Sequence, residues 1–184
     1  FIGEERIGGF DDLSAHLGKA TKSKDSMTYK PIIALFSVAF LMATTITWVT
    51  LGTTFTGRTM EWFISISMVL LGLQKLQDVE RFATMFLNYD LLAQRWVRYG
   101  YVYPFVETGA GLLMMAGVLT QLSAPAALFV ASIGAISVFK AVYIDKRELK
   151  CACVGGDSKV PLGFVSLTEN LMMIGMAIWM LSKL

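Results

Sequence analysis

The sequence predicts an all-α integral membrane protein, a helical bundle with five transmembrane helices and one interfacial amphipathic helix. The chain of 184 residues is 55% hydrophobic and only 16% charged, whereas a soluble domain carries about 25% charge. Long uncharged runs alternate with short charged segments, and an uncharged run of about 18 residues is long enough to span a bilayer. We therefore expect membrane lipid around the chain and no nucleic-acid partner.

The first 30 residues precede the bundle. Residues 1–18 combine short apolar pieces with a glycine pair and an aspartate that can cap a helix. Residues 19–30 carry lysines among small polar residues, which is typical of a linker. The bundle then occupies 31–184. Since Phe1 is not an initiator methionine, we expect the chain to be a piece of something longer.

Five apolar segments are expected to span the membrane: 31–51, 59–76, 101–122, 126–144 and 161–181. Glu61 and Lys75 lie near the ends of the second span, from where long side chains can reach the membrane surface. Residues 78–98 place apolar side chains at helical spacing, which predicts an amphipathic helix on the membrane surface that ends at Gly100. Residues 123–125, which include a proline, predict a tight turn between the third and fourth spans.

The positive charges are distributed unequally between the two sides of the predicted bundle. Of the 16 Lys and Arg residues, all but Arg58 and Lys183 lie before the first span, or near or beyond the end of the second or fourth span. Segments rich in Lys and Arg remain in the cytoplasm. We therefore expect a bacterial inner (cytoplasmic) membrane protein whose N-terminus and loop 145–160 are cytoplasmic and whose C-terminus is periplasmic.

Both cysteines of the chain, Cys151 and Cys153, lie in loop 145–160. Nearby cationic side chains favour the reactive thiolate. Two residues of extended chain span roughly 6.6–7.2 Å, whereas a disulfide needs Cα atoms about 4.4–6.8 Å apart. A bridge here therefore needs a bent backbone, which Gly155 and Gly156 allow, and strained disulfides are the labile ones that exchange. Two other interpretations remain: a soft-metal site for Cu(I) or Zn, and a turn with unreactive thiols.

Glu107 and Glu169 are the single acids of the third and fifth predicted spans. An acid inside a span is costly and indicates a function, such as proton relay, cation binding or lining of a polar cavity. The alternative is a protonated or hydrogen-bonded acid that holds two helices together. On the fifth span, three methionines recur at every fourth position, a pattern that can pass Cu(I) but more often packs. These are Met172, Met176 and Met180.

From about residue 59 to 184 the chain resembles the MauE (methylamine-utilisation) branch of the DoxX-like membrane family. The segments that carry the resemblance are Gly72–Asp78, Asn88–Leu92, Pro104–Glu107, Cys151–Gly156 and Thr168–Asn170. The family pattern is Cys-Gly-Cys-Phe-Gly at the cysteines and Arg-Asn in the last helix, so Ala152, Val154 and Glu169 depart from it. The resemblance implies a four-helix core and a role in maturing disulfide-containing periplasmic enzymes. The extra span 31–51 would invert that core, so this role does not transfer directly.

Residues 1–18 resemble the last strand, Gly-Gly turn and final helix of a glutaredoxin. This resemblance implies that Gly9, Phe10 and Asp11 help to hold the γ-glutamyl end of glutathione, the one cofactor it suggests, and that the catalytic part of the domain lies upstream.

The leading hypothesis from the sequence is a membrane thiol–disulfide redox protein. In it, a cytosolic glutaredoxin-like module exchanges with Cys151 and Cys153, which relay electrons to a membrane or protein partner. The first alternative is a non-catalytic accessory or assembly subunit packed against a larger membrane complex. The second is a copper-handling membrane protein. The sequence does not decide whether the chain is itself an enzyme.

Overall fold

The computed structural model describes residues 29–146 and 162–184. In these residues the secondary structure is entirely helical: seven α-helices and one π-helical turn. They are α2 (Lys30–Leu51), α3 (Gly57–Leu76), α4 (Val79–Phe86), α5 (Leu91–Arg95), α6 (Val97–Ala116), α7 (Thr120–Phe139), η1 (Lys140–Ile144) and α8 (Phe164–Leu181). The expected glutaredoxin-like tail 1–18 and the cysteines Cys151 and Cys153 lie outside the described residues.

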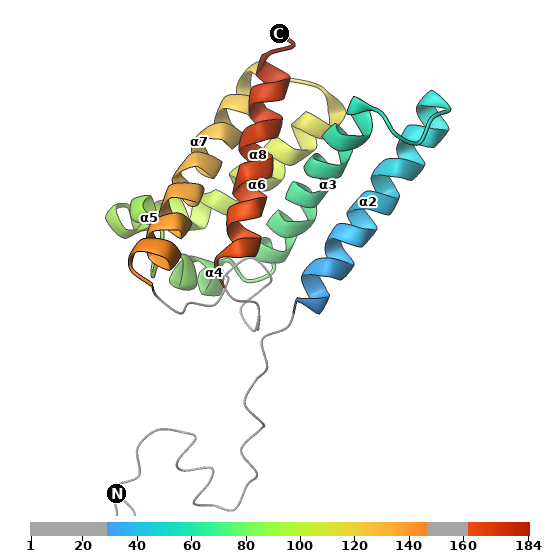
Figure 1. Cartoon of the computed structure of the whole chain (residues 1–184). Coiled ribbons are helices and arrows are strands. Elements are labelled where there is room, and N and C mark those ends of the chain that lie inside the picture. The colour runs from blue at the N-terminus through green and yellow to red at the C-terminus, as the bar shows by residue number, and fades with distance from the viewer. Residues whose placement is uncertain (1–28, 147–161) are drawn as a thin grey trace, which may run out of the picture.

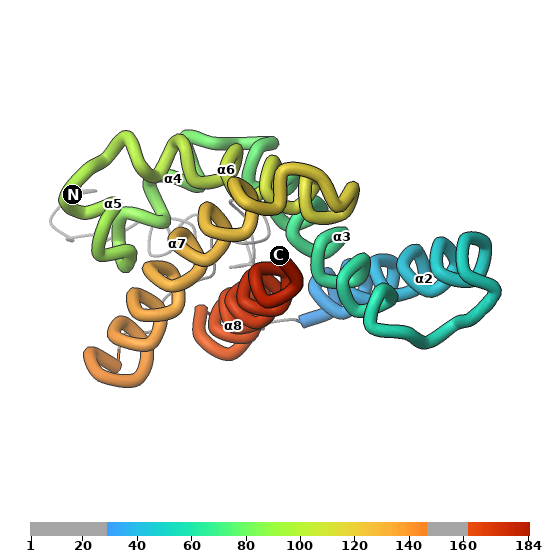
Figure 2. Tube along the Cα trace, turned by 90° about the horizontal axis from the view of Figure 1, so that it is seen from above, coloured from blue at the N-terminus to red at the C-terminus, as the bar shows by residue number. Residues whose placement is uncertain are grey.

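Five long helices form the body of the molecule, and α4 and α5 are short connectors between α3 and α6 (Figure 1). The helix α3 packs against α6, α6 against α7, and α7 against α8. The outermost helix, α2, packs mainly against α3, which leaves it at one edge of the bundle (Figure 2). The ends of α3 and η1 and the beginning of α8 lie at the same end of the bundle (Figure 1). The segment that contains the cysteines therefore leaves and re-enters the described structure at this end.

The helices α3 and α6 approach closely because glycines line their contact. A Cβ on Gly111 would lie 3.0 Å from Cβ of Met68, and a Cβ on Gly72 would lie 2.2 Å from Oγ1 of Thr108. Small residues at such positions let two membrane helices approach backbone to backbone. The register that these glycines fix also decides which polar side chains of α3 and α6 meet.

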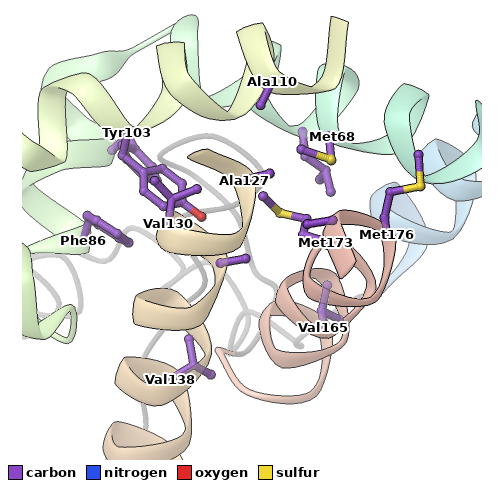
Figure 3. Packing of buried hydrophobic residues seen from close by; sticks show 14 of the residues in the cluster. Met68, Phe86, Tyr103, Ala110, Ala127, Val130, Val138, Val165, Met173 and Met176 are labelled. Atoms are coloured by element: carbon purple, nitrogen blue, oxygen red, sulfur yellow. The ribbon is translucent and has the colours of Figure 1, made fainter. Parts of the chain in front are cut away.

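The centre of the bundle is apolar, and so is most of its outer surface. Met68, Ala127 and Met173 converge from α3, α7 and α8 (Figure 3), and each is at most 1% exposed. Large apolar side chains on the outer faces are strongly exposed, including Val49 at 78% and Phe129 at 58%. A protein that shows such a surface on most of its helices meets lipid rather than water.

Three of the helices in the described part of the chain are long and apolar enough to cross a membrane. They are α2, α7 extended through η1 (Thr120–Ile144), and α8. The helices α3 and α6 have the length but carry more charge: Arg58, Glu61 and Lys75 in α3, and Arg98 and Glu107 in α6. Of the five transmembrane helices expected, three thus have the length and composition of a span.

Two local predictions were wrong. Segment 78–98 is not one helix: the extended backbone of Asp90 divides it into α4 and α5, and α6 already begins at Val97. Gly100 lies buried inside α6, where a Cβ would lie 3.5 Å from Cβ of Ala83, so it allows close packing and does not end a helix.

The turn expected at 123–125 is also absent from the described structure, since these residues belong to α7. The chain reverses earlier, at Gly117, which caps α6 with a φ of 70°.

Candidate functional site

The candidate functional site is a charged cluster inside the bundle that joins three helices. Lys75 is the last residue but one of α3, and its side chain is 3% exposed. Its Nζ donates hydrogen bonds to both carboxylate oxygens of Glu107 on α6, at 2.7 and 2.6 Å. It donates a third to Oε1 of Glu169 on α8, at 2.9 Å. The three donors of the ammonium therefore all have carboxylate partners.

Aromatic rings form one wall of this ion cluster (Lys75, Glu107 and Glu169). The ammonium of Lys75 lies 5.3 Å from the ring centroid of Tyr103 and 6.0 Å from that of Phe82. Rings at such distances attract a cation through the negative face of their π-system. Phe86 extends the wall, with its ring 4.8 Å from that of Tyr103 (Figure 3). Aromatic rings and carboxylates thus surround the ammonium and exclude solvent from it.

A small cavity of about 20 Å³ lies against the ion cluster. Its lining includes Lys75, Tyr103, Glu169 and Asn170. Asn170 is 5% exposed, and its amide nitrogen donates to the carbonyl of Ser166 at 2.7 Å, but its Oδ1 has no hydrogen-bond partner. A water molecule needs roughly 10–15 Å³ of such space and two or more polar partners. The cavity is therefore the size of one water and has polar groups to hold it.

Gly134 of α7 makes room for Asn170. A Cβ at this position would lie only 2.6 Å from Oδ1 of Asn170. A glycine in the middle of a helix costs roughly 0.5–1 kcal/mol relative to alanine, so its presence here serves the close approach of α7 to the polar side chain of α8.

Asp90 directly follows Tyr89, which lines the cavity, in the connector between α4 and α5. Its Oδ1 accepts hydrogen bonds from the backbone N–H groups of Leu92 and Ala93, at 3.0 and 2.8 Å, and so caps α5. The carboxyl is fully buried. Burial raises the pKa of Asp90 above its ordinary value, because removal from water penalises the ionised form more than the two backbone donors stabilise it.

A second charged group closes the opposite end of the bundle. Glu61 of α3 is 3% exposed; Arg58 contacts it at 2.7 Å and Trp179 donates to it at 2.8 Å from its indole nitrogen. Lys183, just after α8, completes the set. This group ties α3 to the end of α8, and every oxygen of Glu61 is paired. The prediction that Lys75 extends to the membrane surface was wrong, since its carboxylate partners lie inside the bundle. Glu61 is buried at the bundle end, where its partners Arg58 and Lys183 are 39% and 51% exposed.

The structure brings two predicted site residues together and leaves others outside its reach. Glu107 and Glu169 meet on Lys75, a partner that the sequence pattern did not indicate. Of the methionine stripe, Met176 and Met180 are buried in the core and Met172 is half-buried. In the described ranges, no three His, Cys, Asp or Glu residues are grouped in a way that could hold a metal. Five predicted site residues lie outside the described residues: Gly9, Phe10, Asp11, Cys151 and Cys153.

The family whose description reads "Methylamine utilisation protein MauE" matches residues 53–183. The chain belongs to the MauE family. All three residues of the ion cluster lie inside the matched region, and α2 lies outside it, so the first long helix is an addition to the MauE part of this chain. Family membership agrees with the three candidate spans in identifying a membrane protein of the methylamine-utilisation type. No curated protein and no solved structure matches the chain.

Proposed function

We propose that this MauE-family chain is a membrane thiol–disulfide redox protein. Cys151 and Cys153 exchange with a cytosolic glutaredoxin-like module and pass electrons to a membrane or protein partner. One observation carries the proposal. The turn η1 ends at Ile144 and α8 begins at Phe164, five residues before Glu169, at the end of the bundle where α3 finishes one residue after Lys75 (Figure 1). The segment with both cysteines is thus tethered at the end that holds the buried ion cluster.

The exchange is balanced without any further reactant. Oxidation of the two thiols forms one S–S bond and releases two electrons and two protons. The disulfide of the partner takes up both, its own S–S bond breaks, and it becomes a dithiol. Attack through a mixed disulfide needs an accessible sulfur on each side. Glutathione, held by Gly9, Phe10 and Asp11 as the glutaredoxin resemblance implies, would reduce the upstream module.

The proposed topology has five crossings: α2, α3, α6, α7 and α8. The two helices that are less apolar, α3 and α6, bury Lys75, Glu107 and Glu61, whereas Arg58 and Arg98 lie in their first turns and are partly or fully exposed. Charged groups in a span that face the interior and pair with one another are compatible with crossing. The charge asymmetry supports an orientation in which the N-terminus and the cysteine segment are in the cytoplasm and the C-terminus is in the periplasm of a bacterial inner membrane.

Trapping of mixed disulfides tests this function. In a chain that relays electrons, Cys151→Ser and Cys153→Ser differ, because removal of the resolving cysteine leaves the attacking one covalently attached to its partner. We expect one of the two variants to accumulate a reducible adduct in membranes, identified by mass spectrometry, and the double variant to form none. If neither single variant forms an adduct while both are inserted at normal levels, the relay is refuted.

The second candidate, a non-catalytic accessory subunit, is favoured by α2. Only 22% of the most apolar stretch of this helix is buried, and an apolar groove of about 550 Å³ lies between α2 and α8, lined by Phe36, Phe63 and Phe164 among others. Because α2 packs so little against the rest of the chain, its outer face is available to bind a larger membrane complex. A chain that migrates alone after mild solubilisation of native membranes, with no stable neighbour, would exclude this candidate.

A further inference from the structure

The charges of the ion cluster do not balance if all three groups are ionised. One ammonium, that of Lys75, meets two carboxylates. Among the described residues, the groups that line the cavity beside the cluster supply no second cation. Phe82 and Phe86 come from α4, and Gly134 and Val138 come from α7. The remaining titratable neighbours are Tyr89, Asp90, Tyr99 and Tyr103. Among the described residues that line the cavity, Lys75 is the one cation.

A net charge of −1 in this place would be expensive. Glu107 is fully buried and Glu169 is 4% exposed, and both lie in helices with lipid-facing outer surfaces. An unbalanced buried charge costs several kcal/mol even after relaxation, and the usual response of a carboxylate is to bind a proton. Two carboxyls close to one another cannot both ionise without a like-charge penalty. Both contact the same nitrogen, at 2.6 and 2.9 Å, so they are close.

We propose that Glu107 and Glu169 together bind one proton, which the two carboxyl groups share beside the ammonium of Lys75. In this proposal, the cavity beside Asn170 holds the water molecule through which this proton exchanges. The set is then neutral: one ammonium, one carboxylate and one carboxylic acid. The ligand of the site is a proton together with a single water molecule. The proposed site includes neither Cys151 nor Cys153 and does not depend on the thiol chemistry proposed above.

Two features of the cavity support its role as the exchange port. Its volume of about 20 Å³ accommodates one water and nothing larger. Asn170 lines this space and its Oδ1 is an acceptor without a partner, and an unsatisfied buried acceptor costs roughly 1–3 kcal/mol. A water molecule that donates to Asn170 and contacts Glu169 removes this cost and gives the carboxyl a hydrogen-bonded route away from the cluster.

Infrared spectroscopy of the full chain in lipid nanodiscs tests the proton. A protonated carboxyl has a C=O stretch that a carboxylate lacks, and the stretch shifts in D₂O. We expect this band at neutral pH in the wild type, and its loss in both Glu107→Gln and Glu169→Gln, because the single remaining carboxylate pairs with Lys75. In Lys75→Met both carboxyls lose their cation, so the band should roughly double in area. Spectra taken as wild type minus variant cancel the signal of Asp90.

The wild-type spectrum alone can overturn the proposal. If no protonated carboxyl is present at neutral pH, both acids are ionised and the site binds no proton. If the wild-type-minus-variant spectra show no loss of the band in either glutamine variant, the band comes from elsewhere and the assignment is refuted equally. The double variant Cys151→Ser/Cys153→Ser should keep the band, since the site does not depend on the cysteines. Failure of the relay and failure of the proton site are therefore separate results.

The exchange port has its own test with a matched control. Gly134→Ala places a methyl group 2.6 Å from Oδ1 of Asn170 and pushes this side chain into the cavity, whereas a Cβ on Gly175 of α8 meets nothing within 4 Å. We expect H/D exchange of the carboxyl band to slow by roughly tenfold in Gly134→Ala, equivalent to about 1.4 kcal/mol on the barrier, and to stay unchanged in Gly175→Ala. Asn170→Leu, which removes the acceptor without a new contact at Gly134, should slow exchange as well. Unchanged exchange in both port variants would refute the port.

Discussion

Lys75 joins three helices through one side chain, and its partners are distant in the sequence. Glu107 lies 32 residues further along the chain and Glu169 lies 94 residues further along. From the sequence, each acid was recognisable as a costly group inside a span. Their meeting on Lys75 was not predictable, because it depends on the register of α3 against both α6 and α8. A lysine near a predicted span end usually reaches toward water, and only tertiary packing shows that this one is enclosed.

Replacement of Lys75 by methionine should destabilise the protein strongly. The variant keeps the length of the side chain but leaves two buried carboxyls without their cation, and loss of one partner from a buried ion pair costs about 3–5 kcal/mol. Thermal unfolding in detergent, followed by loss of monodisperse protein, measures the effect. Lys183→Met is the matched control: Lys183 is half exposed, and Glu61 retains Arg58 and Trp179. An equal loss of thermal stability in the two variants would show that the ion cluster stabilises the protein no more than the half-exposed Lys183 does.

Asp90 should make stability depend on pH in a defined direction. Burial raises its pKa in the folded protein, so the folded state holds the proton more tightly than the unfolded chain does. Stability therefore falls as pH rises from the ordinary value of 3.8 through the raised pKa, and below 3.8 this contribution is constant. Asp90→Asn caps α5 equally well and cannot ionise. We expect the melting temperature of the variant, relative to wild type, to improve across this interval. Parallel pH profiles of the two proteins would contradict the assignment.

The long helices α3 and α6 could be recognised in the sequence, but their pairing could not. The sequence indicated both helices, since each is a long apolar run. The beginning of α7 was harder to predict, because a proline is ambiguous inside a membrane helix and Pro125 suggested a turn. Pro104 and Pro125 both lie within helices here, and membrane helices tolerate proline where side chains and neighbouring helices satisfy the freed backbone groups. Asp90 had the opposite effect: its local capping bonds divided a segment whose apolar spacing predicted one continuous helix.

Gly72→Ala should weaken the contact between α3 and α6. The added Cβ would lie 2.2 Å from Oγ1 of Thr108 and 3.2 Å from its backbone nitrogen, so the helices must separate. Overpacking of this kind typically costs about 1–3 kcal/mol. Gly109→Ala on α6 is the control, because nothing lies within 4 Å of its Cβ. A lower melting temperature for Gly72→Ala alone is the expected outcome, and equal melting temperatures would show that this glycine is not needed for close packing.

The molecule as a whole follows from the distribution of charge along the chain. Uncharged runs separated by short basic segments predicted a membrane bundle, and the described residues form one with three helices of clear spanning character. The helices α3 and α6 are less apolar because they contribute the charged residues of the buried ion pairs. No sequence pattern distinguishes an inward-facing charge from one that prevents crossing, which explains why the number of spans is harder to establish than the class of fold.

The proposed orientation predicts where reporters should be active. With the N-terminus in the cytoplasm and five crossings, a periplasm-dependent phosphatase fused after Leu184 should be active, and the same enzyme fused at Lys146, after η1, should be inactive. The opposite activities are expected of a cytoplasmic reporter at these two sites. A phosphatase that is active at Lys146 would contradict the orientation derived from the lysine and arginine distribution.

The most direct test of the redox function is a titration of Cys151 and Cys153 in the full-length membrane protein. The two thiols are equilibrated against buffers of defined potential, alkylated, and counted by mass spectrometry. The relay predicts a reversible two-electron transition between dithiol and disulfide, in the range of glutaredoxins at about −200 to −230 mV. Cysteines that stay reduced at every potential, with or without glutathione, would contradict the relay and favour an accessory subunit instead.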